Sequence, residues 1–136
     1  MEVYRLTRQK FASVLSGKGA AIKGARWNSQ GVEIIYTAAN RSLAMAEVAV
    51  HFTLATLPEN YVMSTIFIPD NTSIQKITIA DLPGDWNSFP HNPITQAIGD
   101  RFSTENKGLE LSEMFAQRKN KPQQKETVFI HRTTYI

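Results

Sequence analysis

The chain contains no cysteine, and this absence excludes several kinds of site. Without thiols it can form no disulfide, bind no zinc through thiolates and use no cysteine nucleophile. Its three histidines, His51, His91 and His131, are far apart in the sequence. They lack the close spacing of a metal-binding motif. We therefore expect no metal cofactor.

Long apolar runs and phosphate-binding glycine motifs are also missing. No hydrophobic stretch reaches the roughly 20 residues that a membrane-spanning helix needs. The first residues, Met1 to Arg5, already carry charge and do not begin a signal peptide. Neither the glycine fingerprint of a Rossmann unit nor a P-loop occurs. These absences predict a cytoplasmic protein that has no membrane association.

The composition is that of an ordinary globular chain, with 136 residues, 42% hydrophobic and 20% charged. This length suits one domain with a core of its own. The whole net charge of +3 lies in residues 112–136, which hold five basic and two acidic residues. Because these basic residues are not interleaved with aromatics along a helix, direct nucleic-acid binding is not favoured.

Residues 1–50 are locally positive, with seven Lys and Arg residues against three acids. This balance suits a phosphate-bearing ligand, although the same asymmetry arises as ordinary surface charge. Alternating and β-branched segments predict strands near 1–6, 32–37, 61–68 and 74–79, and another near 125–136. Helical spacing predicts a turn over 10–15 and helices over 41–54 and 94–102. Interleaved strands and helices of this kind predict an α+β fold.

The segment from Lys23 to Val50 concentrates the residues of chemical interest. Arg26 lies in a short loop between Gly24 and Gly31, where small residues allow a ligand to approach the backbone. A guanidinium there can hold a phosphate with two parallel hydrogen bonds. Tyr36 follows near the end of a predicted strand. From the residues alone, Arg26 as a solvated loop arginine and Tyr36 as a core aromatic remain open.

The helix predicted over 41–54 carries one acid of interest. Asn40 or Ser42 can cap its first turn through the side-chain oxygen. Apolar residues recur at three- and four-residue steps, and Glu47 falls on or beside this stripe. We therefore expect Glu47 to be partly buried, held near a partner, or both, although an exposed helix acid is the ordinary alternative. A catalytic role for His51, four residues later, is not favoured.

Several separated blocks together resemble the RES-domain family in order and spacing, over roughly residues 1–111. The blocks are Tyr4-Arg5-Leu6, Gly24-Ala25-Arg26-Trp27-Asn28-Ser29-Gln30-Gly31, Ile35-Tyr36-Thr37-Ala38, Ser42-Leu43-Ala44-Met45-Ala46-Glu47, Ile68-Pro69-Asp70, Leu82-Pro83-Gly84-Asp85-Trp86 and Ala97-Ile98-Gly99-Asp100. The resemblance implies a compact α+β domain like that of ADP-ribosyltransferases. It also implies the toxin of a type II toxin–antitoxin pair, which consumes NAD⁺ as substrate and arrests growth. The implied partner is an Xre-like helix-turn-helix antitoxin that covers the active site in a hetero-oligomer.

The resemblance places the family's catalytic arginine, tyrosine and glutamate on Arg26, Tyr36 and Glu47. Cleavage of the nicotinamide–ribose bond passes through an oxocarbenium-like species. Arg26 would hold the pyrophosphate, Tyr36 would offer a flat surface to nicotinamide, and Glu47 would stabilise the sugar cation or hold a ribose hydroxyl. Trp27 and Asn28 would line the NAD⁺ pocket together with Arg26 and Tyr36. The acceptor is water, phosphate or a protein side chain.

The chain departs from the family pattern after residue 111. Family members have a valine-proline-serine segment there, whereas Ser112 is followed by Glu113 and has no proline before it. We therefore separate a RES-like NAD-binding domain, residues 1–111, from an atypical basic segment, residues 112–136. Ser112 could replace the missing serine only in a different context. The departure leaves an alternative, in which a catalytically impaired RES-fold protein acts only as a binding partner of its antitoxin.

Overall fold

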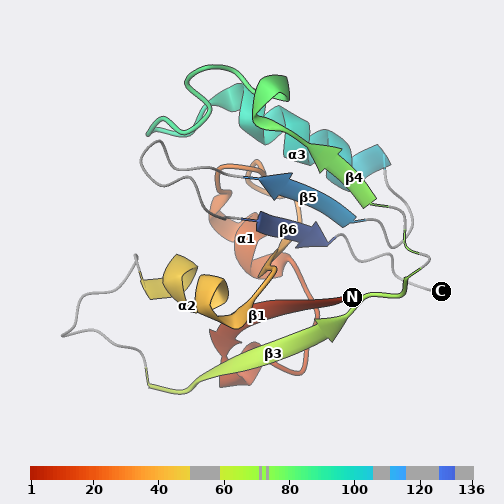
Figure 1. The fold of residues 1–136 in the computed structure, drawn as a ribbon. Helices are drawn as coiled ribbons and strands as arrows, with labels where there is room; N and C mark the ends of the chain where they lie inside the picture. The colour runs from red at the N-terminus through yellow and green to blue at the C-terminus, as the bar shows by residue number, and fades with distance from the viewer. Residues whose placement is uncertain (50–58, 71, 73, 106–110, 116–125, 131–136) are drawn as a thin grey trace.

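The backbone is built on one six-stranded sheet, seen in Figure 1 with helices packed around it. The computed structural model describes residues 1–49, 59–70, 72, 74–105, 111–115 and 126–130. Its strands are β1 (Glu2–Arg8), β2 (Ile35–Ala38), β3 (Tyr61–Phe67), β4 (Ile74–Ile77), β5 (Leu111–Phe115) and β6 (Glu126–Ile130). Its helices are α1 (Lys18–Lys23), α2 (Arg41–Ala49) and α3 (Pro93–Glu105). This mixture of strands and helices confirms the α+β fold class.

The spatial order of the strands is β3-β1-β2-β6-β5-β4. All neighbours are antiparallel except β4 and β5, which are parallel. β6, from the end of the chain, pairs with β2, so that Tyr36 lies opposite Phe129. The segment after residue 111 therefore supplies two strands to the interior of the same sheet. In the described parts of the chain, no helix is long and apolar enough to cross a membrane.

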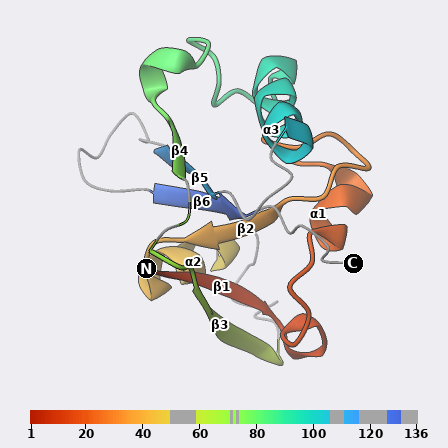
Figure 2. The same cartoon turned by 90° about the vertical axis from the view of Figure 1, so that its right-hand side faces the viewer.

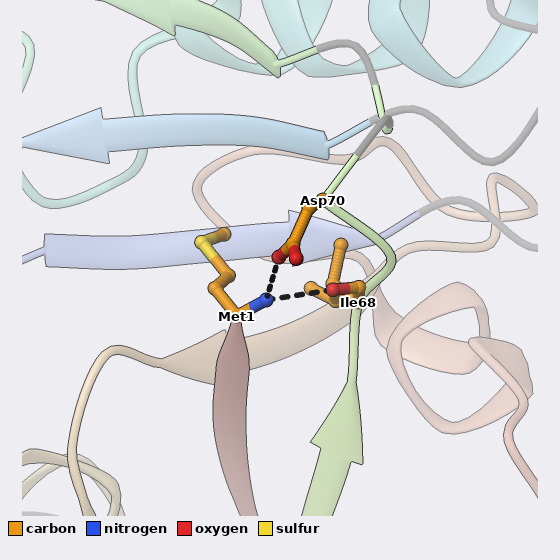
Figure 3. A network of polar contacts seen from close by, with 3 residues as sticks. All are labelled: Met1, Ile68 and Asp70. Carbon is orange, nitrogen blue, oxygen red and sulfur yellow. Dashed lines mark hydrogen bonds and ion pairs between the residues drawn. The ribbon is translucent and has the colours of Figure 1, made fainter.

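The N-terminal amino group is fastened to the end of β3, as Figure 3 shows. It donates to the carbonyl oxygen of Ile68 at 2.7 Å and to Asp70 Oδ1 at 3.2 Å. Asp70 is exposed, so the ion pair itself contributes little to stability. The bond to Ile68 instead extends the β1–β3 pairing by one residue and closes that end of the sheet.

Alternation along β2 divides its side chains between two packing clusters. Ile35 packs with Val3 and Ile68 in one buried cluster. Tyr36, on the opposite face, packs against a second cluster that contains Trp27 and Phe102. The strand that was predicted to carry Tyr36 therefore places its ring toward the Arg26 turn and α3.

Helix α1 was not predicted, because glycine disfavours helical structure and this segment contains Gly17 and Gly19. Gly17 instead precedes the helix, where a Cβ atom would lie only 2.6 Å from the backbone nitrogen of Ile34. The glycine is therefore needed for close packing of two backbone segments. The helical turn expected over residues 10–15 is a 3₁₀ turn at Gln9–Phe11.

Helix α2 begins as predicted, since Asn40 Oδ1 accepts a hydrogen bond from the Leu43 backbone N–H at 2.8 Å. Its buried residues are Leu43 and Ala44, which pack on Ala38. Glu47 is exposed, so it is not partly buried, but it does interact with a neighbouring group, which was the other expected outcome. Glu47 lies four residues after Leu43 and three after Ala44, and therefore on the same face of α2, but only the first turn of this face is buried. The part of the predicted helix after residue 49 lies outside the described residues.

Candidate active site

Arg26 is carried by a tight turn that runs from Gly24 to Gly31. The turn closes on itself through a hydrogen bond from the Ala25 N–H to the Asn28 carbonyl oxygen at 2.9 Å. Gly24 and Gly31 have φ angles of 69° and 91°, which side chains rarely adopt. A Cβ atom at Gly24 would also come within 3.0 Å of the Asn28 carbonyl oxygen. At Gly24, glycine is thus required by the turn itself.

The guanidinium of Arg26 is held by the loop that precedes α3. Its Nη1 donates to the carbonyl oxygens of Trp86 at 2.6 Å and Ser88 at 3.1 Å. The group also lies 5.9 Å from the centre of the Trp86 ring, within the range of a cation–π contact. Nε and Nη2 have no hydrogen-bond partner among the residues that the structure describes. Desolvation by burial lowers the pKa of Arg26, although a guanidinium stays charged.

The two tryptophans of the chain stack beside this arginine. The Trp27 and Trp86 rings are 6.1 Å apart between centroids and 23° from parallel. Trp27 is buried and packs against Ile34 and Phe102, whereas Trp86 is half-buried. The pair therefore joins the Arg26 turn to the loop that precedes α3.

Tyr36 reaches the same turn from β2. Its hydroxyl donates to Asn28 Oδ1 at 2.6 Å. Burial raises the pKa of Tyr36 well above its ordinary value, and the charge of Asp100 raises it further, while the Trp27 backbone N–H and the charge of Arg26 oppose the shift. Tyr36 is consequently a neutral phenol at physiological pH, with its proton directed at Asn28.

Asn28 is completely buried under the turn. Its Nδ2 donates to the carbonyl oxygens of Val32 at 2.9 Å, Ala20 at 3.1 Å and Ser29 at 3.3 Å. With the Tyr36 hydroxyl bound to Oδ1, both the oxygen and the nitrogen of the amide are hydrogen-bonded. The structure thus brings Arg26, Trp27, Asn28 and Tyr36 together around one turn, with Trp27 and Asn28 beneath its surface.

Helix α3 holds the turn from the other side, and Figure 2 shows the turn between α1 and α3. Asp100 Oδ1 accepts from the Ser29 N–H at 2.8 Å, and Gln96 Nε2 donates to the Ala25 carbonyl oxygen at 2.9 Å. Trp86, Ser88, Gln96 and Asp100 were not among the predicted site residues. Trp86 and Asp100 each belong to one of the resembling blocks, and this was the only signal for their role.

His91 lies near the charge of Arg26, on the loop before α3. Its Nδ1 is buried and has no hydrogen-bond partner in the structure. Desolvation, and then the positive charge of Arg26, lower the pKa of His91 below its usual value. The ring also makes an edge contact with Phe89, at 5.6 Å between centroids. His91 is therefore a neutral side chain beside the guanidinium at physiological pH.

Glu47 lies on α2, the helix that follows β2. Leu43, one turn before Glu47, packs on Ala38, which lies two residues beyond Tyr36 on the same face of the strand. The carboxylate itself is exposed, outside the buried cluster that contains Trp27. His51 and His131 lie outside the described residues. Within the described ranges, no three His, Asp or Glu residues form a group that could hold a metal ion.

A surface hollow of about 640 Å³ lies at a different place, around the end of β1. It is lined by Arg8, Gln9, Lys10, Glu59 and Asn60. None of the predicted site residues contributes to it, so the candidate site rests on the contacts around the Arg26 turn.

Comparison with known proteins agrees with the motif blocks. The RES domain matches residues 2–111. A protein named Toxin Res from Photorhabdus laumondii is 39% identical over 103 residues, which cover 75% of this chain and 65% of the relative. The Prs ADP-ribosylating toxin of a Sphingobium species is 37% identical over 94 residues, covering 68% of this chain and 58% of that toxin. The chain thus spans less than two thirds of the length of these two relatives.

A solved structure shares the fold. In the crystal structure of the M. tuberculosis MbcT–MbcA toxin–antitoxin complex, the matching chain has a TM-score of 0.67 and 22% identity, with 96% of this chain and 72% of that chain covered. At this identity the likeness shows the fold alone. The domain match covers well over half of the sequence and includes Arg26, Tyr36 and Glu47. The chain belongs to the RES domain family.

Proposed function

We propose that this chain is the toxin of a toxin–antitoxin pair and that it cleaves NAD⁺ at the bond between nicotinamide and ribose. Membership of the RES domain family supports this, as does similarity to a relative named as an ADP-ribosylating toxin. NAD⁺ is the common biological donor of ADP-ribose. The observation that carries the proposal is Arg26, a guanidinium fixed by two backbone carbonyls beside stacked aromatic rings, with Nε and Nη2 not bonded to any described residue.

Arg26 suits the pyrophosphate of NAD⁺. Nη1 is committed to two backbone carbonyls, so the side chain does not have to be ordered when a ligand binds. Nε and Nη2 remain to donate to phosphate oxygens, and charge-assisted bonds of this kind are among the strongest in proteins. Partial burial strengthens them further, because the local dielectric is low.

The proposed reaction breaks the bond between C1′ of the ribose and N1 of nicotinamide. The bonding electrons leave with neutral nicotinamide, and positive charge develops on the ribose. An acceptor then adds to C1′ and loses a proton. Water as acceptor gives ADP-ribose, phosphate gives ADP-ribose-1″-phosphate, and a protein side chain gives an ADP-ribosylated product.

In this scheme Glu47 supplies the negative charge. Its carboxylate would stabilise the cationic ribose or hold a ribose hydroxyl. Exposure on α2 leaves it accessible to a ligand, and the packing of Leu43 on Ala38 fixes the helix to the strand that carries Tyr36. Tyr36 would contribute its ring, because its hydroxyl is bound to Asn28.

The test is incubation of the purified chain with NAD⁺, followed by identification of the products by mass. Free nicotinamide together with one of the three ADP-ribose products is the expected result. Glu47→Gln keeps the size of the side chain and removes its charge, and should abolish most of the turnover. Glu105→Gln, an equally simple change at an exposed position on α3, serves as the control. No NAD⁺ loss from the folded wild-type chain would reject the proposed activity.

The proposed partner is an Xre-like helix-turn-helix antitoxin that covers the site in a hetero-oligomer. The likeness to a chain of a toxin–antitoxin complex supports an antitoxin of some kind. Departure from the family pattern after residue 111 favours a second candidate, a catalytically impaired chain that only binds its antitoxin. Co-purification with the antitoxin, combined with no NAD⁺ turnover after its removal, would favour that second candidate.

A further inference from the structure

Asn28 has no exposed surface with which to touch a ligand. Its amide nevertheless makes four hydrogen bonds, one accepted from Tyr36 and three donated to backbone carbonyls. A buried amide that is fully satisfied in this way is costly to remove, because each lost bond leaves a partner without compensation. Its contacts therefore fix the surrounding backbone in one arrangement.

Those contacts join the three pieces of chain that form the candidate site. The bond to the Ala20 carbonyl reaches α1, and the bond to Val32 closes the turn toward β2. The Tyr36 hydroxyl attaches the strand at 2.6 Å. Arg26 is only two residues before Asn28 on the same turn, so this amide links the backbone that carries the guanidinium to the phenol ring.

We infer that Asn28 is a positioning residue, which sets the separation of Arg26 and Tyr36 for binding the dinucleotide. This inference rests on the proposed function, because it assigns Asn28 to the same NAD⁺ site. The role differs from direct lining of the pocket. Asn28 acts through its neighbours, and its loss should misplace groups that themselves meet the substrate.

The turn has other attachments that should survive the loss of Asn28. Asp100 binds the Ser29 N–H and Gln96 binds the Ala25 carbonyl, both from α3. Replacement of Asn28 should therefore leave the turn docked on α3 while removing its side-chain link to Tyr36, so that only the Trp27 backbone N–H still joins the turn to the phenol. The expected defect is misalignment within a folded protein, for which losses of about 10²-fold in rate per ångström are typical.

The chain offers an independent reporter of this alignment. Its two tryptophans, Trp27 and Trp86, are the stacked pair beside Arg26, and Trp27 is the neighbour of Asn28. Near-ultraviolet circular dichroism of the pair thus reports the position of the turn without any substrate. Far-ultraviolet circular dichroism reports separately whether the domain is folded.

The experiment compares wild type with Asn28→Ser and Gln30→Ala. Gln30 is the matched control, since it is an exposed amide in the same turn that donates to the Ile22 carbonyl at 3.1 Å. We expect Asn28→Ser to remain folded, to change the tryptophan signal and to lower kcat/KM for NAD⁺ by about 10²-fold, mainly through KM. Gln30→Ala should match wild type in all three measurements.

Tyr36→Phe tests the same link from the strand side, should Asn28→Ser fail to fold. It removes the bond to Asn28 together with the one from the Trp27 backbone N–H, and should shift the tryptophan signal and KM in the same direction. A folded Asn28→Ser with wild-type kcat/KM, or Tyr36→Phe with an unchanged signal and KM, would overturn the inference. Absence of NAD⁺ turnover in wild type itself rejects the proposed function and the NAD⁺ role of Asn28 together. In that case the tryptophan signal still shows whether Asn28 fixes the turn.

Discussion

Gly99 on α3 lies directly against the Trp27 carbonyl, so closely that a Cβ atom added at Gly99 would be 1.7 Å from that oxygen. No side chain fits this contact unless the helix and the turn move apart. This close contact explains why position 99 is a glycine. The next residue, Asp100, accepts a hydrogen bond from the Ser29 N–H of the same turn. The position of the Arg26 turn therefore depends directly on the position of α3.

Gly99→Ala should therefore destabilise the fold, although alanine favours a helix in isolation. Overpacking of this kind typically costs about 1–3 kcal/mol. Gly19→Ala is the matched control, because Gly19 is also helical and an added Cβ would meet nothing within 4 Å. That change should stabilise by about 0.5–1 kcal/mol. Urea unfolding of both variants measures these changes in the free energy of unfolding. A Gly99→Ala variant as stable as wild type would show that α3 can shift freely.

Arg26→Lys should weaken NAD⁺ binding although it conserves the positive charge. A lysine ammonium lacks the planar fork that reaches the Trp86 and Ser88 carbonyls while presenting further donors. Loss of one or two charge-assisted bonds, at about 1.5–3 kcal/mol, corresponds to a rise in KM of roughly 10- to 100-fold. Arg101→Lys provides the comparison, since Arg101 is exposed and forms an ion pair with Glu105 one turn later in the same helix. Equal KM values for the two variants would contradict a geometric role for the guanidinium.

Local sequence patterns predicted the parts of this molecule that depend on near neighbours. The strand at residues 61–67, helix α3 and the Asn40 cap all follow from alternation, helical spacing and one capping side chain. The exposure of Glu47 did not follow, because it depends on how far along α2 the rest of the fold covers its inner face, and only Leu43 and Ala44 are buried there.

The candidate site shows the same division. The Arg26 turn could be recognised from its glycines, but its partners on the far side could not. Asp100 contacts Ser29 across 71 residues, and the Trp86 carbonyl contacts Arg26 across 60. Sequence spacing carries no information about such distant pairs in a single chain. Only the family resemblance brought the Gly99-Asp100 block into view.

Tyr36 should make the stability of the fold sensitive to strongly alkaline pH. Burial raises its pKa above the ordinary value of about 10. The unfolded chain therefore loses this proton first, and the contribution of the neutral phenol is fully present below about pH 10. It is lost as the pH rises through the higher folded pKa, by up to about 1.4 kcal/mol per pH unit.

Comparison of wild type with Tyr36→Phe isolates this effect from other titrations, which both proteins share. The difference in their free energies of unfolding should be constant from pH 8 to about pH 9.5 and should fall above about pH 10. Urea unfolding at three pH values measures it. A difference that stays constant up to pH 11 would mean that the Tyr36 phenol titrates normally in the folded protein.

His91 should make the stability of the fold sensitive to acidic pH. Desolvation and the nearby charge of Arg26 lower its pKa, so the folded chain resists protonation of the ring while the unfolded chain accepts a proton near pH 6.5. Its contribution is present above the unfolded pKa and is lost as the pH falls through the lower folded pKa. Wild type should therefore lose stability relative to His91→Gln when the pH is lowered from 8 to 5, because glutamine does not titrate. Thermal unfolding of both proteins across this range tests the sign, and a wild type that gains stability relative to the variant on acidification would show that His91 has found an acidic partner instead.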